Sequence, residues 1–510
     1  MHYQKLFLSQ LLLTGLGQSK PLETNHETRQ DSKIEWKDCE LGLGEVVPFQ
    51  CGSLTVPLDY TNESNDATLN LDLQKVAALN QPSKGSILLN FGGPGSSGKP
   101  DLAASATILQ AGTNTTLGFS CFATQEERQI TSLTNPVILG NSSNVALGKI
   151  WAETEVFDST CYALQNQTGN FIGTAFTARD FMSVVDALGE DGMLRYWGIS
   201  YGTLLGSTLA AMFPDRIDRM VIDGVVNPYE YYANDEVELF DSTDDVFKGF
   251  CSGCVNNPEN CTLGVGSTAE ELEDYIYSFL ETIKYNPVVV PTGAGMSFVD
   301  YTSIKSVLFK SLDAPSQWPD IAAILGALIS GDFETIGEYF SKTASGGSGM
   351  DAEAQFGIKC SDSTQGATNI TEVLPIIEAR HEASRFGDAA DHVIMRCARW
   401  PMPAKERYEG DFNIKTKFPV LVIGNTYDSV TPLASAKNVS AGFDGSVLLQ
   451  QNSYGHTSLV QASECTAKII MAYYANGTLP EANTVCETDA KMFSGDRGWE
   501  GVLQKLANGE

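Results

Sequence analysis

The sequence is poor in positive charge. Its 33 lysines and arginines stand against 63 aspartates and glutamates, which gives a formal net charge of −30 at pH 7. Because nucleic-acid phosphates are also negative, this balance excludes nucleic acid as an expected partner. After its first residues the chain also lacks any run of about 18 apolar residues, the length that a membrane span needs. We therefore expect no binding to nucleic acid and no crossing of a membrane.

Recognisable cofactor motifs are also lacking. The glycine-rich stretch NFGGPGSSG, residues 90–98, matches neither G-x-G-x-x-G nor a phosphate-binding loop with a lysine. In CSGCVNNPENC, a zinc site at Cys251, Cys254 and Cys261 is conceivable, but no fourth cysteine or histidine lies at ligand spacing. We therefore expect neither a metal nor a cofactor.

Cysteine, by contrast, is well represented. Eleven cysteines in 510 residues are typical of a protein that folds in an oxidising compartment. Lys5 precedes a short apolar run, which predicts a signal peptide over residues 1–19, with a plain N-terminal helix as the alternative. Eight Asn-x-Ser/Thr sequons fit a secreted, soluble glycoprotein. They are Asn62, Asn114, Asn141, Asn166, Asn260, Asn369, Asn438 and Asn476.

Spacing along the chain suggests five disulfides. The expected pairs are Cys39–Cys51, Cys121–Cys161, Cys251–Cys261, Cys360–Cys397 and Cys465–Cys486. The first and last would each close a short loop, and Cys254 would be left over.

Apolar runs alternate with helical patterns in the N-terminal part of the chain. SILLNF (86–91), LRYWGI (194–199) and RMVIDGV (219–225) predict buried strands. ARDFMSVVDALG (178–189) predicts a helix that ends at Gly189. Upstream, GSLTVPL and TLNLDLQKVAAL predict a pair of antiparallel edge strands.

The same alternation returns near the C-terminus. FPVLVIGN (418–425) and GSVLLQQ (445–451) predict strands on either side of a helix. Strands that alternate with helices imply an α/β fold, with a mostly parallel sheet and helices on both faces.

Between these regions, residues 230–400 are mainly helical in pattern. AEELEDYIYSFLETIKY, DYTSIKSVLFKSL and PDIAAILGALIS each predict a helix, and TASGGSGMDAEAQ predicts a flexible connection. This organisation predicts core segments over 36–229 and 401–510, with a helical cap inserted over 230–400.

The stretch GISYG, residues 198–202, places Ser200 where a predicted strand turns into a helix. Two flanking glycines permit a sharp, strained turn that exposes the serine hydroxyl, as in a nucleophile elbow. The G-x-S-x-G pattern alone occurs by chance in roughly one of three chains this rich in glycine, so its context has to decide.

Two later residues complete a candidate catalytic triad. Asp428 lies in VLVIGNTYDSVTP, just after a predicted strand, and His456 lies in SYGHTSL, just after the next one. A helix-capping aspartate and a structural histidine are the plain alternatives. The order Ser200, Asp428, His456 is nevertheless that of the α/β hydrolases. Backbone N–H groups of Gly93 and Tyr201 are the expected oxyanion hole.

These motifs resemble one branch of the α/β hydrolases, the secreted tripeptidyl-aminopeptidase-like group related to proline iminopeptidases and well represented in bacteria and fungi. The resemblance extends from about Trp36 to Cys486 and includes CGSLTVPLDY, LNFGGPGSSG, the helix and elbow RDFMSVVDALGEDGMLRYWGISYGT, MFPDRIDRMVIDGVVNP, FKGFC, IKCSDS, CARWP, GNTYDSVTP and CTAKIIMAYYANGTLPEANTVC. It implies an α/β-hydrolase fold with a cap and the release of short peptides or single residues from free N-termini.

The chain departs from the family pattern at one place. The family has a strand ending in an Asp-Arg-Gly type turn between the oxyanion loop and the nucleophile strand. Here DLAASATILQAGTNTTLGFSCF (101–122) has no such apolar run, and PVILG (136–140) is too short and too late to replace it. Loss of a central strand would leave its neighbours without ladder partners. We expect either that the coding sequence has lost a segment near residue 112 or that this copy is structurally compromised.

The expected function is hydrolysis through an acyl-enzyme. Ser200 would attack, His456 would act as base and then acid, and Asp428 would orient the imidazole. A peptidase acting on free N-termini is the main hypothesis, and a small-molecule ester hydrolase is the alternative. A non-catalytic binding protein that retains the fold is a further alternative. A peptide, ester or amide is the expected partner, and the protein is expected to be a monomer.

Overall fold

The computed structural model describes residues 34–39, 49–62, 64–78, 82–95, 118–292, 295–343 and 350–508, all within one unit, Lys33–Glu510. The predicted signal peptide and Asn114 lie outside the described residues. So does most of 101–122, where the sequence lacks the apolar run expected of the family strand. Among the described residues, no helix is long and apolar enough to cross a membrane.

Six parallel strands form the central sheet, in the order β11-β10-β9-β6-β5-β4. The predicted parallel α/β sheet is thereby confirmed. Five of its strands coincide with predicted apolar runs, whereas the short β11 was not predicted. The bounds are β4 Leu88–Asn90, β5 Leu194–Ile199, β6 Ile217–Asp223, β9 Leu421–Tyr427, β10 Val447–Tyr454 and β11 Val485–Glu487.

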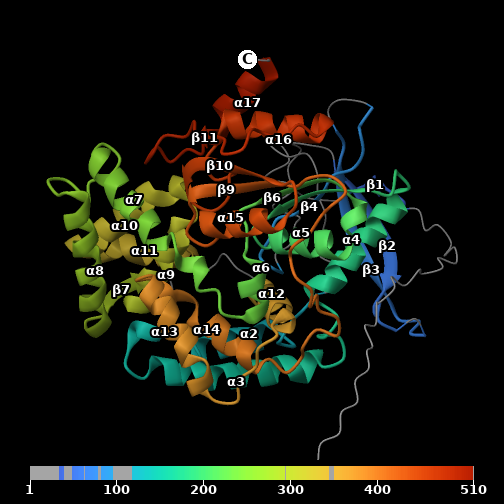
Figure 1. Cartoon of the computed structure of the whole chain (residues 1–510). Coiled ribbons are helices and arrows are strands. Elements are labelled where there is room, and N and C mark those ends of the chain that lie inside the picture. Colours follow the sequence, from blue (N-terminus) through green and yellow to red (C-terminus); the bar gives the residue numbers. More distant parts are fainter. Residues whose placement is uncertain are drawn as a thin grey trace, which may run out of the picture. The chain divides into compact units, whose positions relative to one another are not determined.

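Helices cover both faces of this sheet (Figure 1). Alternate strand residues point to opposite faces, so Tyr196 and Trp197 belong to two different cores. The core around Tyr196 is closed by α4 (Thr174–Leu188), α5 (Tyr201–Met212) and α15 (Leu433–Gly442). The core around Trp197 is closed by α16 (Glu464–Asn476) and the start of α17 (Trp499–Asn508). As predicted, α4 ends at Gly189, which has a φ of 64°.

A second, three-stranded sheet lies beside α4. It consists of β1 (Lys37–Asp38), β2 (Phe49–Pro57) and β3 (Thr68–Val76), and its antiparallel β2–β3 pair is the predicted one. Its apolar residues share the core of α4 and α5. In the described part of the chain the central sheet ends at β4, and no strand connects the two sheets.

The stretch between β6 and β9 is mainly helical, with a two-stranded hairpin that the sequence patterns did not reveal. Helix α8 coincides with the predicted run and begins in a capping box at Thr268. The bounds are α6 Pro228–Ala233, α7 Thr243–Asn256, α8 Ala269–Tyr285, β7 Val288–Thr292, β8 Gly295–Val299, α9 Tyr301–Leu312, α10 Trp318–Ser330, α11 Phe333–Thr343, α12 Met350–Asp362, α13 Leu374–Ala383 and α14 Asp391–Arg399.

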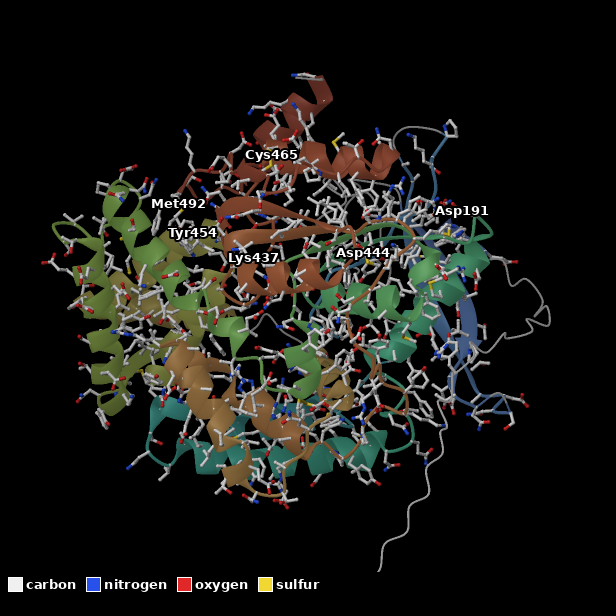
Figure 2. All side chains as sticks on the ribbon, viewed as in Figure 1. Asp191, Lys437, Asp444, Tyr454, Cys465 and Met492 are labelled. Carbon is white, nitrogen blue, oxygen red and sulfur yellow. A yellow bond between two sulfur atoms is a disulfide. The ribbon has the colours of Figure 1, made fainter. Side chains whose placement is uncertain are left out.

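This helical region differs from the predicted pattern in two respects. Helices α2 (Gln125–Thr134) and α3 (Ala146–Gln165) come from the segment before the nucleophile strand, yet α3 packs directly on α14. The predicted flexible connection also extends too far, since α12 begins at Met350. Tyr454 of β10 and Met492 pack against the core of α7 to α10 (Figure 2).

The described residues contain five disulfides. They are Cys39–Cys51, Cys121–Cys161, Cys254–Cys261, Cys360–Cys397 and Cys465–Cys486. The predicted Cys251–Cys261 pair is wrong, because Cys254 occupies the last turn of α7 and the short loop brings Cys261 back against that turn. The Cys261 amide donates to the Asn257 carbonyl at 2.9 Å. Cys251 lies one turn earlier, unoxidised and buried in the core of α7 to α10.

Candidate active site

Ser200 lies in the sharp turn between β5 and α5. It has a φ of 58° and a ψ of −126°, a strained conformation for a residue with a side chain. Its amide donates to the Asp223 carbonyl at 3.0 Å, and its carbonyl accepts from the Thr203 amide at 2.7 Å. The neighbouring strand and the first turn of the helix therefore hold the strained turn in place.

Both glycines of GISYG are required by close packing. A Cβ on Gly198 would lie 2.1 Å from the Gly202 carbonyl oxygen, and one on Gly202 would lie 2.4 Å from the Asn90 carbonyl oxygen. Because real Cβ atoms do not approach so closely, any side chain here would push strand and helix apart. The local geometry is that of a nucleophile elbow.

Asp428 and His456 follow β9 and β10, and the parallel order of these strands brings their loops together. Nδ1 of His456 lies 3.0 Å and 3.2 Å from the two carboxylate oxygens of Asp428. Asp428 is completely buried and also accepts from the amides of Val430, Thr431 and Thr457 at 2.8–3.0 Å. These donors fix the carboxylate and favour its ionised form.

The two pKa shifts agree with an ion pair. Burial raises the pKa of Asp428, but the charge and hydrogen bond of His456, together with the backbone hydrogen bonds of Val430 and Thr431, outweigh it, and the net pKa lies below the usual value. Burial lowers the pKa of His456, but the charge and hydrogen bond of Asp428, together with the charge of Asp313, outweigh it and raise the net pKa above the usual value. Asp428 thus stabilises the protonated imidazole, as a triad carboxylate must.

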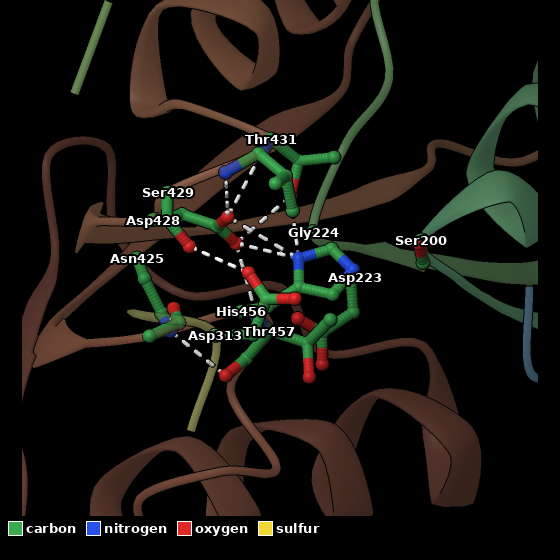
Figure 3. Close-up of polar contacts among 12 residues, drawn as sticks. Ser200, Asp223, Gly224, Asp313, Asn425, Asp428, Ser429, Thr431, His456 and Thr457 are labelled. Atoms are coloured by element: carbon green, nitrogen blue, oxygen red, sulfur yellow. Dashed lines mark hydrogen bonds and ion pairs between the residues drawn. The ribbon is translucent and has the colours of Figure 1, made fainter. Parts of the chain in front are cut away.

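Ser200 faces this pair without contacting it. Figure 3 shows the imidazole with its second nitrogen on the side of Ser200, and no hydrogen bond joins the two residues in the described structure. The Ser200 hydroxyl lies instead beside Gly92, where an added Cβ would be 3.3 Å from Oγ. Catalytic hydrogen bonds are often open in the absence of substrate and shorten when it binds.

The glycine loop after β4 lies against the elbow. Gly92 and Gly93 have φ values of 101° and 108°, which side-chain-bearing residues rarely adopt. A Cβ on Gly92 would lie 2.8 Å from Cβ of Ser200. Tyr201 is the first residue of α5, so its N–H has no acceptor within the helix. Tyr201 directly follows Ser200, and Gly92, the neighbour of Gly93, lies against it. The oxyanion hole at the N–H groups of Gly93 and Tyr201 stays a prediction.

Sequence patterns missed two further groups around Asp428 and His456. Thr431 donates its hydroxyl to Asp428 at 2.8 Å and lies 3.0 Å from Nδ1 of His456. In the sequence it was visible only as the residue before a helix-starting proline. Asp223, at the end of β6, is fully buried and accepts from the amide of Ser458 at 2.9 Å. Burial raises the pKa of Asp223 to about 6, although the Ser458 hydrogen bonds oppose that shift.

Other candidate residues lie away from the triad. Seven of the eight sequon asparagines are in the described structure, and all seven are exposed. Their modification stays a prediction. A pocket of about 400 Å³ lies at the end of α5 against residues 406–410, and it contains none of the triad residues. The described residues hold no cluster of three or more histidine, cysteine or carboxylate side chains suited to a metal.

Comparison with known proteins places the chain among hydrolases. Residues 382–486, which include Asp428 and His456, match the family described as TAP-like protein. The chain is 25% identical over 496 residues to the serine protease Hip1 of Mycobacterium tuberculosis, covering 90% of this chain and 92% of that protein. It is 26% identical over 495 residues to the tripeptidyl aminopeptidase of Streptomyces coelicolor, covering 90% and 86%.

Two further similarities complete the comparison. The chain is 24% identical over 500 residues to carboxylesterase B of Mycobacterium tuberculosis, covering 88% of this chain and 89% of that protein. A solved α/β hydrolase from a Medee basin deep-sea metagenome library overlaps with 85% of this chain and 96% of its own, at a TM-score of 0.31 and 11% identity. The parallel sheet with helices on both faces agrees with the predicted α/β-hydrolase fold. The TAP-like match and the similarity to a serine protease and a tripeptidyl aminopeptidase agree with the family resemblance that the motifs predict.

Proposed function

We propose that this protein is a secreted serine hydrolase that releases short peptides or single residues from free peptide N-termini. The observation that carries the proposal is the buried Asp428 carboxylate bonded to Nδ1 of His456, with the strained Ser200 turn on the other side of the imidazole. Similarity to a serine protease and to a tripeptidyl aminopeptidase over nine tenths of the chain favours a peptide substrate. Five disulfides favour an oxidising compartment.

The proposed reaction proceeds in two halves. His456 accepts the proton of the Ser200 hydroxyl while the Ser200 oxygen attacks the substrate carbonyl, and the N–H groups of Gly93 and Tyr201 stabilise the oxyanion. His456 then protonates the leaving amine, which departs and leaves an acyl-enzyme. Water, deprotonated by His456, attacks the acyl carbon, and Ser200 recovers its proton as the product acid leaves. Asp428 orients the imidazole and stabilises its positive form throughout.

Replacement of the nucleophile tests the mechanism. Ser200→Ala should lower turnover by a factor on the order of 10⁴ or more and abolish labelling by a fluorophosphonate probe, without lowering the thermal midpoint. Ser207→Ala is the matched control, because it removes a hydroxyl from the same helix that donates only to the Thr203 carbonyl. Turnover retained by Ser200→Ala would rule the mechanism out.

An ester hydrolase acting on a small molecule is the second candidate, favoured by the similarity to carboxylesterase B. The same triad serves both reactions, so the substrate has to decide. Tripeptidyl and aminoacyl anilides with free N-termini should be hydrolysed faster than the same compounds acetylated at the N-terminus, and faster than short acyl esters. Preference for acyl esters, or indifference to acetylation, would favour the second candidate.

A binding protein that retains the fold is the third candidate, and the open Ser200–His456 contact is the observation that favours it. Fluorophosphonate labelling separates this candidate from both enzymes. A folded protein that stays unlabelled at Ser200 would be a binder.

A further inference from the structure

One cap residue contacts both loops that carry the imidazole and its carboxylate partner. Asp313 follows the last residue of α9, and its main-chain carbonyl accepts from the His456 amide at 2.8 Å. Its side chain accepts from the Ser429 hydroxyl at 2.7 Å. Because Ser429 directly follows Asp428, one residue of the cap is bonded to the loop of the acid and to the loop of the base (Figure 3).

The turn around Asp313 fits tightly against the histidine loop. Gly455 has a φ of 90°, and a Cβ there would lie 2.8 Å from the Asp313 carbonyl oxygen and 2.5 Å from Cδ of Pro315. Beyond the turn, the buried ring of Trp318 packs edge-on against Tyr454 with centroids 5.7 Å apart. The Trp318 indole N–H donates to the Ser311 carbonyl at 3.0 Å, which closes the turn on itself. The cap turn and the histidine loop therefore have little freedom to move independently.

Charges on this turn also act on the imidazole. The charged groups around His456 are Asp428 from its own core, Asp223 from β6, and Asp313 and Lys310 from the cap. Burial and Asp428 have the largest effects on the pKa of His456. Among the smaller effects, Asp313 raises this pKa and Lys310 lowers it. Nζ of Lys310 lies 3.2 Å from the Asp313 carboxylate, and the lysine side chain is 84% exposed. The two cap charges thus oppose each other at the imidazole.

We propose that Asp313 is a positioning residue through which the cap holds the His456 and Asp428 loops in their catalytic arrangement. The inference rests on the proposed hydrolase function and deepens it. The carbonyl of Asp313 fixes the position of the loop that carries His456. Its carboxylate fixes the loop that carries Asp428, through the Ser429 hydroxyl. Displacement of this cap turn changes the placement of the base, and therefore kcat rather than KM.

Two substitutions remove the side-chain contact from either end. Asp313→Ala and Ser429→Ala should each lower kcat about tenfold, the effect of one hydrogen bond, with KM changed less than about twofold. The double variant should be no slower than the singles, because both remove the same contact. Asp300→Asn, at the other end of α9, where Asp300 caps the helix, is the matched control and should leave kcat unchanged.

Two charge substitutions separate positioning from a general structural role. Asp313→Asn keeps an acceptor for Ser429 but removes the negative charge, so the pKa of His456 should fall and the acid limb of kcat/KM should move to lower pH. Lys310→Met should move the same limb to higher pH. Histidine ¹³C NMR titration, simple to assign with only five histidines, should give the same two shifts without depending on turnover.

The outcomes are distinguishable. An Asp313→Ala variant that folds and keeps kcat within twofold of the native protein would overturn the inference, as would unchanged His456 titration in Asp313→Asn. If Asp313→Ala fails to fold, Ser429→Ala and the titration decide. The native protein could fail both to hydrolyse substrates and to react with the probe, while Asp313→Asn still shifts the His456 titration. That result would overturn the proposed function and leave Asp313 beside the imidazole as inferred.

Discussion

At the scale of single residues, the negative charge of Asp428 has the largest electrostatic effect on His456. Three backbone amides, the Thr431 hydroxyl and the imidazole all converge on its carboxylate. A group with so many donors stays ionised, and its charge keeps the pKa of His456 above the usual value of about 6.5. Since His456 acts as a base only when neutral, kcat/KM should rise with pH through a pKa above about 6.5.

Asp428→Asn tests this assignment. An amide cannot stabilise the imidazolium as a carboxylate does, so the acid limb of kcat/KM should move to lower pH and kcat should fall by a factor on the order of 10⁴. The measurement is the pH dependence of kcat/KM for the native protein and the variant. An unshifted limb would show that another group titrates there.

Sequence patterns point to the proposed catalytic side chains but not to the residues that hold them. Ser200, Asp428 and His456 each follow a predicted strand, so chain order and strand ends were sufficient to propose them. Thr431 and Asp313 have no such signal, because their roles arise from contacts between segments far apart in the chain. Asp313 in particular reaches His456 only because the cap turn packs on the histidine loop.

At the scale of elements, the oxyanion loop is fixed by both the core and the cap. Gly92 lies against Ser200, and a Cβ on Gly95 would lie 2.7 Å from the amide of Gln355 in α12. Gly92→Ala should therefore reduce turnover at least about 100-fold, since it would displace the loop that we propose to donate to the oxyanion.

Gly189→Ala is the control for this prediction, because Gly189 also has a positive φ but an added Cβ would meet only open space. It should cost about 1 kcal/mol of unfolding free energy and leave turnover unchanged. Equal activity of the two variants would contradict the close packing of the loop on Ser200. Turnover and the urea midpoint are the two measurements.

Disulfide pairing in α7 gives a second prediction at this scale. Burial raises the pKa of Cys251, so its thiol should not react while the protein is folded. Peptide mapping without reduction should recover Cys254 linked to Cys261, and Cys251→Ala should leave that link intact. Recovery of a Cys251–Cys261 peptide from the native protein would contradict the structure.

Helices and strands differ in how well they can be predicted from their sequences. Helix α8 could be bounded exactly because an apolar stripe and a capping box agree. The hairpin of β7 and β8 was missed because Pro291, Gly293 and Gly295 interrupt its apolar residues. The packing of α3 on α14 joins segments more than 200 residues apart, and such pairings leave no periodic signal in either segment.

At the scale of the whole molecule, buried carboxylates set the response to pH. Burial raises several carboxyl pKa values, to about 6 for Asp223 and Asp362 and to about 7 for Asp158, Asp180 and Glu230. A carboxyl group whose pKa is raised in the folded state stabilises the fold at low pH. That contribution to the free energy of unfolding is lost as pH rises from about 4 through the raised pKa. The raised pKa of His456 has the same sign, whereas the lowered pKa values of Asp59, about 2, and Asp428 destabilise the fold only in stronger acid.

We therefore expect the thermal midpoint to rise by several degrees between about pH 7.5 and about pH 5, and to fall again below about pH 4. Circular dichroism melts across this range provide the measurement, repeated in high salt to screen the net charge of −30. Asp158→Asn, which removes a buried carboxyl group whose pKa burial raises to about 7 against the charges of Arg396 and Arg399, should reduce the slope. A midpoint that increases steadily towards neutral pH would contradict the assignment.

One consequence follows from helix α12 alone. Its middle supports Gly95 of the oxyanion loop, and its last turn is tied to α14 through Cys360 and Cys397. We expect a thiol reductant to break this disulfide and loosen α12 beneath the loop, while the strands of the central sheet keep their hydrogen bonds. If the proposed function holds, we expect a chain in a reducing environment to lose activity before it loses its central sheet, so that its activity depends on an oxidising environment.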